Sequence, residues 1–285
     1  MKPFEMSQRQ GEPTVLRLER WEREYGAIAA GFSTRIGGNS TGPYASLNCG
    51  LHVNDDPAVV LGNRKLLAAA LQVPFEAWTC GEQVHGANVA VVTREHRGRG
   101  RLAADDALPD VDALITNEPG IWFVSYYADC VPIYFFDPIR RIIGLAHAGW
   151  KGSVLKIARS TVENMQNEYG SNPADIQAVV GPSIGPCCYE VDRNVQMRIA
   201  AVAEELQIGE QDRLSLYEPG DAEGKYMANL QQFNRQIMIK AGILPSHIEI
   251  CGLCTGCRTD LFFSHRKEHG LTGRMVSWIG LELSV

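Results

Sequence analysis

The chain has 285 residues, of which 45% are hydrophobic and 21% charged, a composition typical of folded globular proteins that argues against disorder. Its 27 Lys and Arg residues stand against 33 Asp and Glu residues, a net charge of −6. This disfavours a nucleic-acid partner, because neutralising phosphates needs clustered positive charge. No stretch approaches the roughly 20 apolar residues that cross a bilayer, and the N-terminal segment lacks the apolar core of a signal peptide. We therefore expect a cytoplasmic protein without a membrane or nucleic-acid partner.

Helical and strand-like segments alternate along the chain. In chain order the sequence predicts a helix over 56–71, strands over 89–93, 113–116, 122–126, 133–136 and 142–146, a helix over 153–169, a strand over 176–180, helices over 194–206 and 229–241, and a strand over 248–251. No Pro/Gly-rich linker interrupts the alternation, which predicts one α/β domain with a mixed sheet covered by helices. Glycine-rich phosphate loops of the dinucleotide-fold and P-loop patterns are absent, so neither enzyme class is supported.

Three residues with metal-binding side chains follow strand-like runs and have small neighbours: His85, Cys130 and His147. Strand ends in α/β proteins are where loops gather to form sites. Two imidazoles and one thiolate suit zinc or copper, and three protein ligands leave a fourth position open, as in catalytic sites. The residues lie 45 and 17 positions apart (130 − 85 and 147 − 130), which is no compact ligand spacing. A satisfied core histidine and a buried thiol therefore stay open as the alternative.

The other cysteines are less informative. Cys251, Cys254 and Cys257 have the two-residue spacing of iron–sulfur and zinc loops, but no fourth ligand follows at a standard distance. In a reducing compartment, incidental thiols are the default expectation for these three. The neighbours Cys187 and Cys188 are too strained for an ordinary disulfide, so a packing role is expected for them.

Eight ordered motifs carry a resemblance to the YfiH/YlmD family, also called laccase-domain or polyphenol-oxidoreductase proteins. They occupy residues 33–38, 42–48, 83–86, 110–113, 128–132, 147–152, 181–191 and 262–266. The match runs from about Gly31 to the C-terminus. It implies a single laccase-type α/β domain over 31–285, preceded by an N-terminal extension over 1–30.

The resemblance also implies a YfiH-like, or CNF-like, fold and a zinc ion held by His85, Cys130 and His147, with copper as the other possible metal. The family is associated with phosphorolysis of adenosine, inosine and methylthioadenosine, and with adenosine deamination. Its older label is a copper-dependent oxidase of phenols. The substrates would then be purine nucleosides and phosphate, handled by a monomer or a small homo-oligomer.

Deamination needs an acid or base beside the metal. A zinc ion with an open position lowers the pKa of bound water toward ~7, and a carboxylate must then shuttle protons. Asp129 adjoins Cys130, and Glu82 lies three residues before His85. Neighbours on an extended segment point to opposite sides, so Asp129 need not face the same pocket as Cys130. Its carboxylate could instead cap the backbone or form a hydrogen bond to a metal-bound histidine.

Phosphorolysis needs groups that hold an anion and a nucleoside together. Lys151, between Trp150 and Gly152, joins Asp129 and Glu82 as a candidate catalytic residue. The predicted substrate-binding residues are Arg35, Ser46, Asn48, Gln83 and Arg266. Surface charge is the alternative for the cationic residues, and turn chemistry is the alternative for Ser46 and Asn48.

Three other functions remain open at this point. A copper oxidase of phenols would relay electrons between several copper centres and needs more histidines than the seven present. A Cys–His hydrolase would use Cys130 as nucleophile with His147 or His85 as its base. A binding module that senses metal or redox state would turn over no nucleoside.

Overall fold

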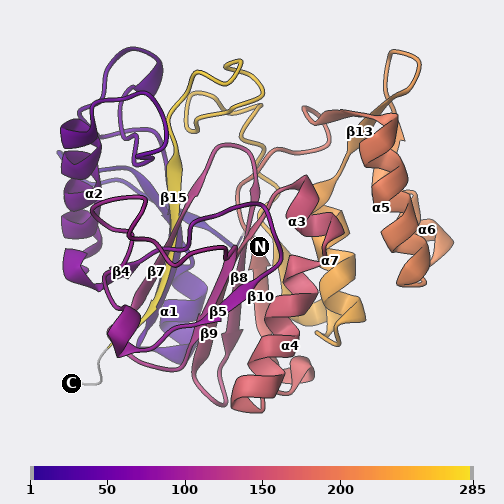
Figure 1. Cartoon of the computed structure of the whole chain (residues 1–285), viewed down its shortest axis with the longest axis horizontal. Coiled ribbons are helices and arrows are strands. Elements are labelled where there is room, and N and C mark those ends of the chain that lie inside the picture. The colour runs from indigo at the N-terminus through magenta and orange to yellow at the C-terminus, as the bar shows by residue number, and fades with distance from the viewer. Residues whose placement is uncertain (1–2, 283–285) are drawn as a thin grey trace.

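Two six-stranded β-sheets lie face to face in the computed structural model, which describes residues 3–282 (Figure 1). The first sheet has the order β1 (Glu5–Ser7), β2 (Val15–Arg17), β3 (Ile28–Ser33), β15 (Met275–Leu281), β7 (Trp122–Tyr127) and β4 (Trp78–Thr79). The second has the order β14 (Ile248–Ile250), β10 (Gln177–Val180), β8 (Val131–Asp137), β9 (Ile142–Ala148), β6 (Ala113–Thr116) and β5 (Val89–Val91). Both contain parallel and antiparallel pairs, so the mixed α/β class expected from the sequence is confirmed.

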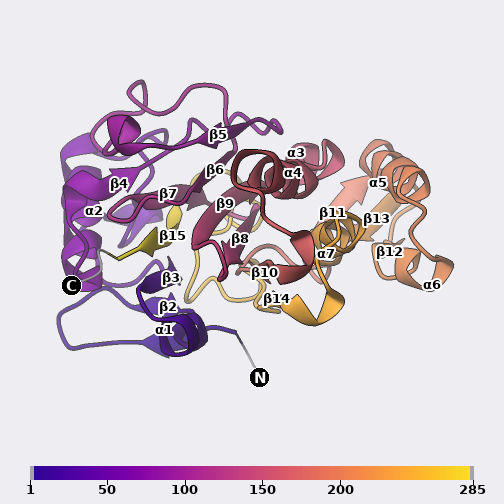
Figure 2. The ribbon, with the colours of Figure 1, turned by 90° about the horizontal axis from the view of Figure 1, so that it is seen from below.

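Helices cover the outer faces of both sheets and give four layers (Figures 1 and 2). The helices are α1 (Glu19–Tyr25), α2 (Pro57–Leu71), α3 (Trp150–Val154), α4 (Ile157–Tyr169), α5 (Arg193–Glu205), α6 (Glu210–Arg213) and α7 (Leu230–Lys240). Helix α2 packs on the first sheet, and α4 and α7 pack on the second. A small third sheet of β11 (Glu190–Asp192), β13 (Lys225–Ala228) and β12 (Tyr217–Pro219) lies with α5 at the far end.

Single 3₁₀ turns lie between the larger elements. They are η1 (Gly42–Tyr44), η2 (Phe75–Ala77), η3 (Arg94–His96), η4 (Pro173–Asp175) and η5 (Pro245–His247). Within residues 3–282, none of the helices combines the length and the apolar character needed to cross a bilayer.

The alternation of side chains along β8 explains the layering. Ile133 and Phe135 pack toward the helices, whereas Tyr134 and Phe136 pack into the space between the sheets. Successive residues of a strand point to opposite faces, so a strand that is apolar at every position is buried on both sides. The same holds for β9, where Ile143 and Leu145 face the other sheet.

The predicted helix over 153–169 is wrong at its start. The structure has two helices there, α3 and α4, joined at Lys156, which has a left-handed backbone with φ 63°. A left-handed residue ends the hydrogen-bond ladder of a right-handed helix. The helical periodicity of apolar residues in the sequence therefore continues past the point where the helix itself is interrupted.

Residues before Gly31 also take part in the sheets. Strands β1 and β2 pair with each other, β2 pairs with β3, and Trp21 of α1 is buried between β-strand side chains. The start of the chain is thus packed against the same core as the rest.

Candidate metal centre and cavity

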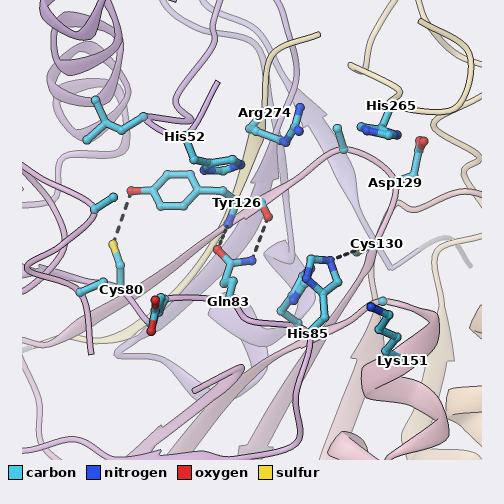
Figure 3. Close-up of a pocket in the computed structure, with 18 of the residues that line it drawn as sticks. His52, Cys80, Gln83, His85, Tyr126, Asp129, Cys130, Lys151, His265 and Arg274 are labelled. Atoms are coloured by element: carbon cyan, nitrogen blue, oxygen red, sulfur yellow. Dashed lines mark hydrogen bonds between the residues drawn. The ribbon is translucent and has the colours of Figure 1, made fainter. Parts of the chain in front are cut away.

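His85, Cys130 and His147 come together in space, and Figure 3 shows the first two beside each other on the wall of a pocket. Their ligand atoms all lie within 4.8 Å of one another, and Cys130 Sγ is 3.8 Å from His85 Nε2. Cys130 lies in the short connection between β7 and β8, which belong to different sheets, and His147 lies near the end of β9. Residues that are far apart in sequence thus meet where the sheets join.

Backbone conformation and hydrogen bonds position the segments that carry the three ligands. His147 follows Leu145 and Ile143 on the face of β9 toward the other sheet, and its ring lies 5.4 Å from that of Tyr127. Gln83 and His85 have left-handed backbones with φ 62° and 63°. The Gln83 side-chain amide accepts from Tyr126 N–H at 2.8 Å and donates to Tyr126 C=O at 2.9 Å, which fastens the His85 loop to β7.

Asp112 holds the two histidines in place. Its carboxylate accepts hydrogen bonds from the backbone N–H groups of His85 and Gly86, at 3.0 and 2.6 Å, and lies 2.8 Å from His147 Nδ1. A proton on Nδ1 leaves Nε2 of His147 with a free lone pair for a metal. Burial acts to raise the pKa of Asp112, but these hydrogen bonds and the charge of His147 outweigh it and hold the pKa below its usual value.

Cys130 and His147 favour each other's charged forms. Burial disfavours both charges, yet the nearby His147 and His85 lower the pKa of Cys130 to about 6. The charge of Cys130 and the hydrogen bond to Asp112 likewise overcome burial and raise the pKa of His147 to about 9. The site therefore supports a thiolate, which is the form of cysteine that binds metals and reacts as a nucleophile.

The donor set and its surroundings fit one metal ion. A tetrahedral zinc with ordinary zinc–nitrogen and zinc–sulfur bonds places an N and an S ligand about 3.6 Å apart, close to the 3.8 Å here. A Cβ at Gly149 would lie 2.8 Å from His85 Cδ2 and 3.0 Å from Cys130 Sγ, so only glycine leaves the ligands this room. His147 is buried and His85 exposed, which leaves one side of the site open.

That open side faces a cavity of about 870 Å³ (Figure 3). This is large enough for a nucleoside, since ligand cavities commonly measure about 300–1,000 Å³. Its wall includes the aromatic residues Tyr126, Trp150 and Tyr189. Its cationic residues are Arg64, Lys151, Arg266 and Arg274.

Five of the predicted catalytic and substrate-binding residues line this cavity: Glu82, Gln83, Asp129, Lys151 and Arg266. Glu82 is exposed, and its Oε2 accepts from Asp110 N–H at 2.9 Å. Arg266 packs its guanidinium 5.0 Å from the Tyr189 ring centre and donates to Glu190 C=O. Lys151 Nζ has no hydrogen-bond or carboxylate partner among residues 3–282 and lies 5.9 Å from the centre of the Trp150 ring.

Asp129 is buried, and three donors occupy its carboxylate. Thr255 Oγ1 donates to Oδ1 at 2.6 Å, while Ser264 Oγ and Arg266 N–H donate to Oδ2 at 3.1 and 2.8 Å. The carboxylate thus ties the β7–β8 connection to two loops of the C-terminal region. This geometry is that of the alternative considered for Asp129, a group that holds backbone in place.

The other three predicted substrate-binding residues do not line the cavity. Arg35 pairs with Glu268 at 2.9 Å and donates to backbone carbonyls. Ser46 Oγ accepts from the N–H groups of Gly37 and Gly38. Asn48 is fully buried and bonds Asp55 and the backbone of Gly50 and Arg274. Their polar groups form hydrogen bonds within the protein, so this structure brings none of the three into the cavity.

The predicted site residues did not include Asp112 or His52, and Arg274 was considered for phosphate binding with surface charge as the alternative. The signal in the sequence that could have identified Asp112 was its place in the motif over 110–113. His52 and Arg274 line the cavity together; Arg274 follows Gly273 in the sequence, whereas His52 has no supporting motif. Desolvation on the cavity wall, with the charges of Arg274 and Arg64, lowers the pKa of His52 to about 4. Arg274 Nη1 donates to two backbone carbonyls, and no carboxylate pairs with Arg274 in the described residues.

Comparisons with known proteins identify relatives of this chain in sequence and in fold. The profile of a family described as "Multi-copper polyphenol oxidoreductase laccase" matches residues 29–282. A Geobacillus stearothermophilus protein named purine nucleoside phosphorylase YlmD is 43% identical, over 90% of this chain and 91% of its own. Its Bacillus subtilis namesake is 37% identical over 95% of both chains. The crystal structure of YlmD from Geobacillus stearothermophilus has a TM-score of 0.90 at 40% identity and covers 99% of this chain and all of its own.

Proposed function

Because the chain belongs to the multi-copper polyphenol oxidoreductase laccase family, whose YlmD relatives are named purine nucleoside phosphorylases, we propose that it is a purine nucleoside phosphorylase. Its substrates are adenosine, inosine and methylthioadenosine, with phosphate as the second substrate. It also deaminates adenosine. His85, Cys130 and His147 hold a zinc ion for these reactions.

The observation that supports this proposal most strongly is the convergence of the three ligand atoms within 4.8 Å on one wall of the cavity. When bound there, zinc would supply Lewis-acid polarisation beside the reacting atoms. Copper suits the same donors, so metal analysis of the purified protein is part of the test.

In phosphorolysis a phosphate oxygen bonds to C1′ of the ribose while the bond from C1′ to the purine nitrogen breaks, which yields ribose 1-phosphate and the free base. For the phosphate, the cavity supplies Lys151 and Arg274, two cations that have no carboxylate partner among residues 3–282. Trp150 and Tyr189 offer aromatic faces to a purine. These groups would hold phosphate and nucleoside in contact, which lowers the entropic part of the barrier.

In deamination water adds to the amino-bearing carbon of adenosine and ammonia leaves, which yields inosine. We assign the proton transfers to Glu82, because its Oε1 is not engaged within residues 3–282 and the side chain lines the cavity. Asp129 instead stabilises the cavity wall, since its carboxylate accepts hydrogen bonds from three donors.

The direct test is incubation of the purified protein with adenosine, with and without phosphate. Chromatography should show phosphate-dependent adenine and ribose 1-phosphate, together with phosphate-independent inosine. Formation of neither product at any phosphate concentration would reject the proposal in favour of a binding module.

Replacing Lys151 with methionine should raise the KM for phosphate about tenfold or more, because a charged hydrogen bond to the anion is lost. The Lys151→Arg variant keeps the charge and serves as the control. Deamination of adenosine uses no phosphate and should change less. An equal loss of both activities in Lys151→Met would mean that Lys151 holds the nucleoside or the fold.

The Glu82→Gln and Asp129→Asn variants separate the two carboxylates. Glu82→Gln should slow deamination by about 10²–10⁴, the usual cost of losing a positioned acid or base, with little change in Tm. Asp129→Asn should cost about 1–3 kcal/mol of folding free energy, because its amide group must face a donor. The measurements are deamination rates and thermal unfolding. A stable Asp129→Asn variant with the larger loss of rate would return the catalytic role to Asp129.

The lowered pKa of Cys130 favours one second candidate, a Cys–His hydrolase with Cys130 as nucleophile. Alkylation followed by mass spectrometry distinguishes the two. A metal-bound Cys130 is protected until a chelator removes the ion. A free nucleophile is labelled at once.

A further inference from the structure

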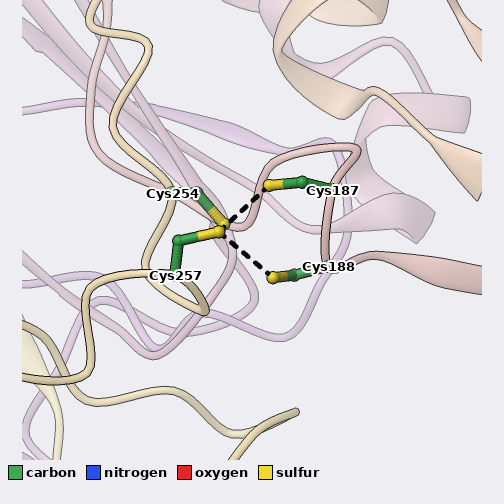
Figure 4. A group of neighbouring side chains, drawn as sticks. All are labelled: Cys187, Cys188, Cys254 and Cys257. Atoms are coloured by element: carbon green, nitrogen blue, oxygen red, sulfur yellow. Dashed lines mark hydrogen bonds between the residues drawn. The ribbon is translucent and has the colours of Figure 1, made fainter.

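Four cysteines from two distant loops form a second cluster (Figure 4). Cys187 and Cys188 lie in a turn between β10 and β11, and Cys254 and Cys257 lie in the loop after β14. All four sulfurs lie within 4.8 Å of one another, and Cys257 Sγ is 3.3 Å from Cys187 Sγ and 3.5 Å from Cys188 Sγ. All four residues are thiols. The separate roles expected from the sequence, packing for one pair and incidental thiols for the other, do not account for this convergence.

The spacing matches a tetrahedral ion with four sulfur ligands. With ordinary zinc–sulfur bonds, the edges of such a tetrahedron measure about 3.8 Å. Because Cys187 and Cys188 occupy a turn rather than a strand, neighbours can point to the same side. Cys251 is not part of the group, so the sequence pattern over 251–257 contributes only its last two cysteines.

The two loops are shaped for close approach. A Cβ at Gly256 would lie 2.9 Å from Cys188 Cβ, and one at Gly185 would lie 3.2 Å from Cys254 Cβ. Gly185 N–H donates to Cys254 Sγ at 3.2 Å, a contact that stabilises a thiolate ligand. A backbone hydrogen bond from Thr255 N–H to Ser183 C=O, at 3.1 Å, joins the loops beside the sulfurs.

We propose that Cys187, Cys188, Cys254 and Cys257 form a second metal site that binds zinc through four thiolates. Four protein ligands leave no position for a substrate, which is the pattern of structural zinc sites. This site is separate from the one at His85 and does not depend on the proposed nucleoside chemistry.

The position of the four-cysteine cluster indicates a structural role for the ion. The first loop also carries Ile184 and Tyr189, which line the cavity, and the second carries Thr255, which donates to Asp129. A shared ion would therefore fix one wall of the cavity. Its removal should loosen both loops and lower the Tm.

The test uses the full chain with the first site disabled by the double substitution His85→Ala and Cys130→Ala. After purification with a phosphine reductant, this protein should retain about one zinc per chain. X-ray absorption at the zinc K edge should show sulfur neighbours only, at about 2.3 Å. Adding Cys257→Ser should lower the zinc content and replace one sulfur, whereas Cys251→Ala serves as the matched control and should change neither.

Three results would overturn the proposal: zinc-free protein with four labelled thiols, a disulfide between the two loops, or bound iron in place of zinc. If Cys257→Ser fails to fold, the X-ray absorption spectrum of the His85→Ala and Cys130→Ala double variant still tests the proposal by itself. Nucleoside turnover is not needed in any arm, so a failure of the proposed function leaves this test intact.

Discussion

Replacing His85 or Cys130 with alanine is expected to remove the metal from the first site and to abolish phosphorolysis and deamination together. Each side chain is one of three ligands, and two ligands hold a zinc ion poorly at an open site. Polarisation by the metal is worth several kcal/mol in the transition state, so both rates should fall by roughly 10²–10³ or more. Metal content by mass spectrometry and both product assays measure the effect.

The matched control for these variants is His269→Asn. His269 is an exposed imidazole that does not line the cavity, and asparagine tolerates its left-handed backbone, φ 52°. This variant should keep its metal and its turnover. A metal-free His85→Ala variant with full activity would show that the ion takes no part in the chemistry.

The Asp112→Asn variant should weaken metal binding by about 10–100-fold, the usual cost of losing the partner of a metal-bound histidine. An amide has one acceptor and one donor end, whereas both oxygens of Asp112 accept: Oδ1 from His147 Nδ1 and His85 N–H, and Oδ2 from Gly86 N–H. If the amide donates to His147 Nδ1, the ring proton moves to Nε2, the atom needed for the metal. If it turns over, its NH2 group takes the place of Oδ2 and faces the N–H of Gly86.

The measurement for Asp112→Asn is activity against added zinc after chelation. Because all three ligands remain, excess zinc should restore much of the activity, whereas His147→Ala should not recover. Wild-type affinity for zinc in Asp112→Asn would mean that the carboxylate serves only the fold. Circular dichroism and Tm values show whether each variant is folded.

Much of the fold could be predicted because its central strands are mostly apolar and buried at every position. Strands β6 to β10 and helices α2, α4, α5 and α7 lie within or beside the predicted ranges. Strands β3 and β15 were not predicted; each contains a glycine, a residue that weakens a strand pattern without excluding one. Gly31 of β3 lies against the Trp278 ring, where a Cβ would overlap it. The requirement for glycine at position 31 therefore comes from the neighbouring strand β15, which the local sequence does not reveal.

The metal ligands could be predicted from residue type and resemblance, but their supporting groups could not. Asp112 acts through contacts with His85 and His147 that no spacing reveals. Arg35 stands in a motif with small neighbours, as a substrate-binding residue would, yet Glu268, 233 positions away, pairs with it. Long-range pairing decides whether a polar residue binds substrate or holds a loop.

Anomalous diffraction from crystals of the wild-type protein, recorded above and below the zinc K edge, tests the first site most directly. The account predicts a difference peak about 2.0–2.3 Å from His85 Nε2, Cys130 Sγ and His147 Nε2. No peak at this position for zinc, or for copper at its own edge, in crystals of protein that converts adenosine and phosphate would contradict it.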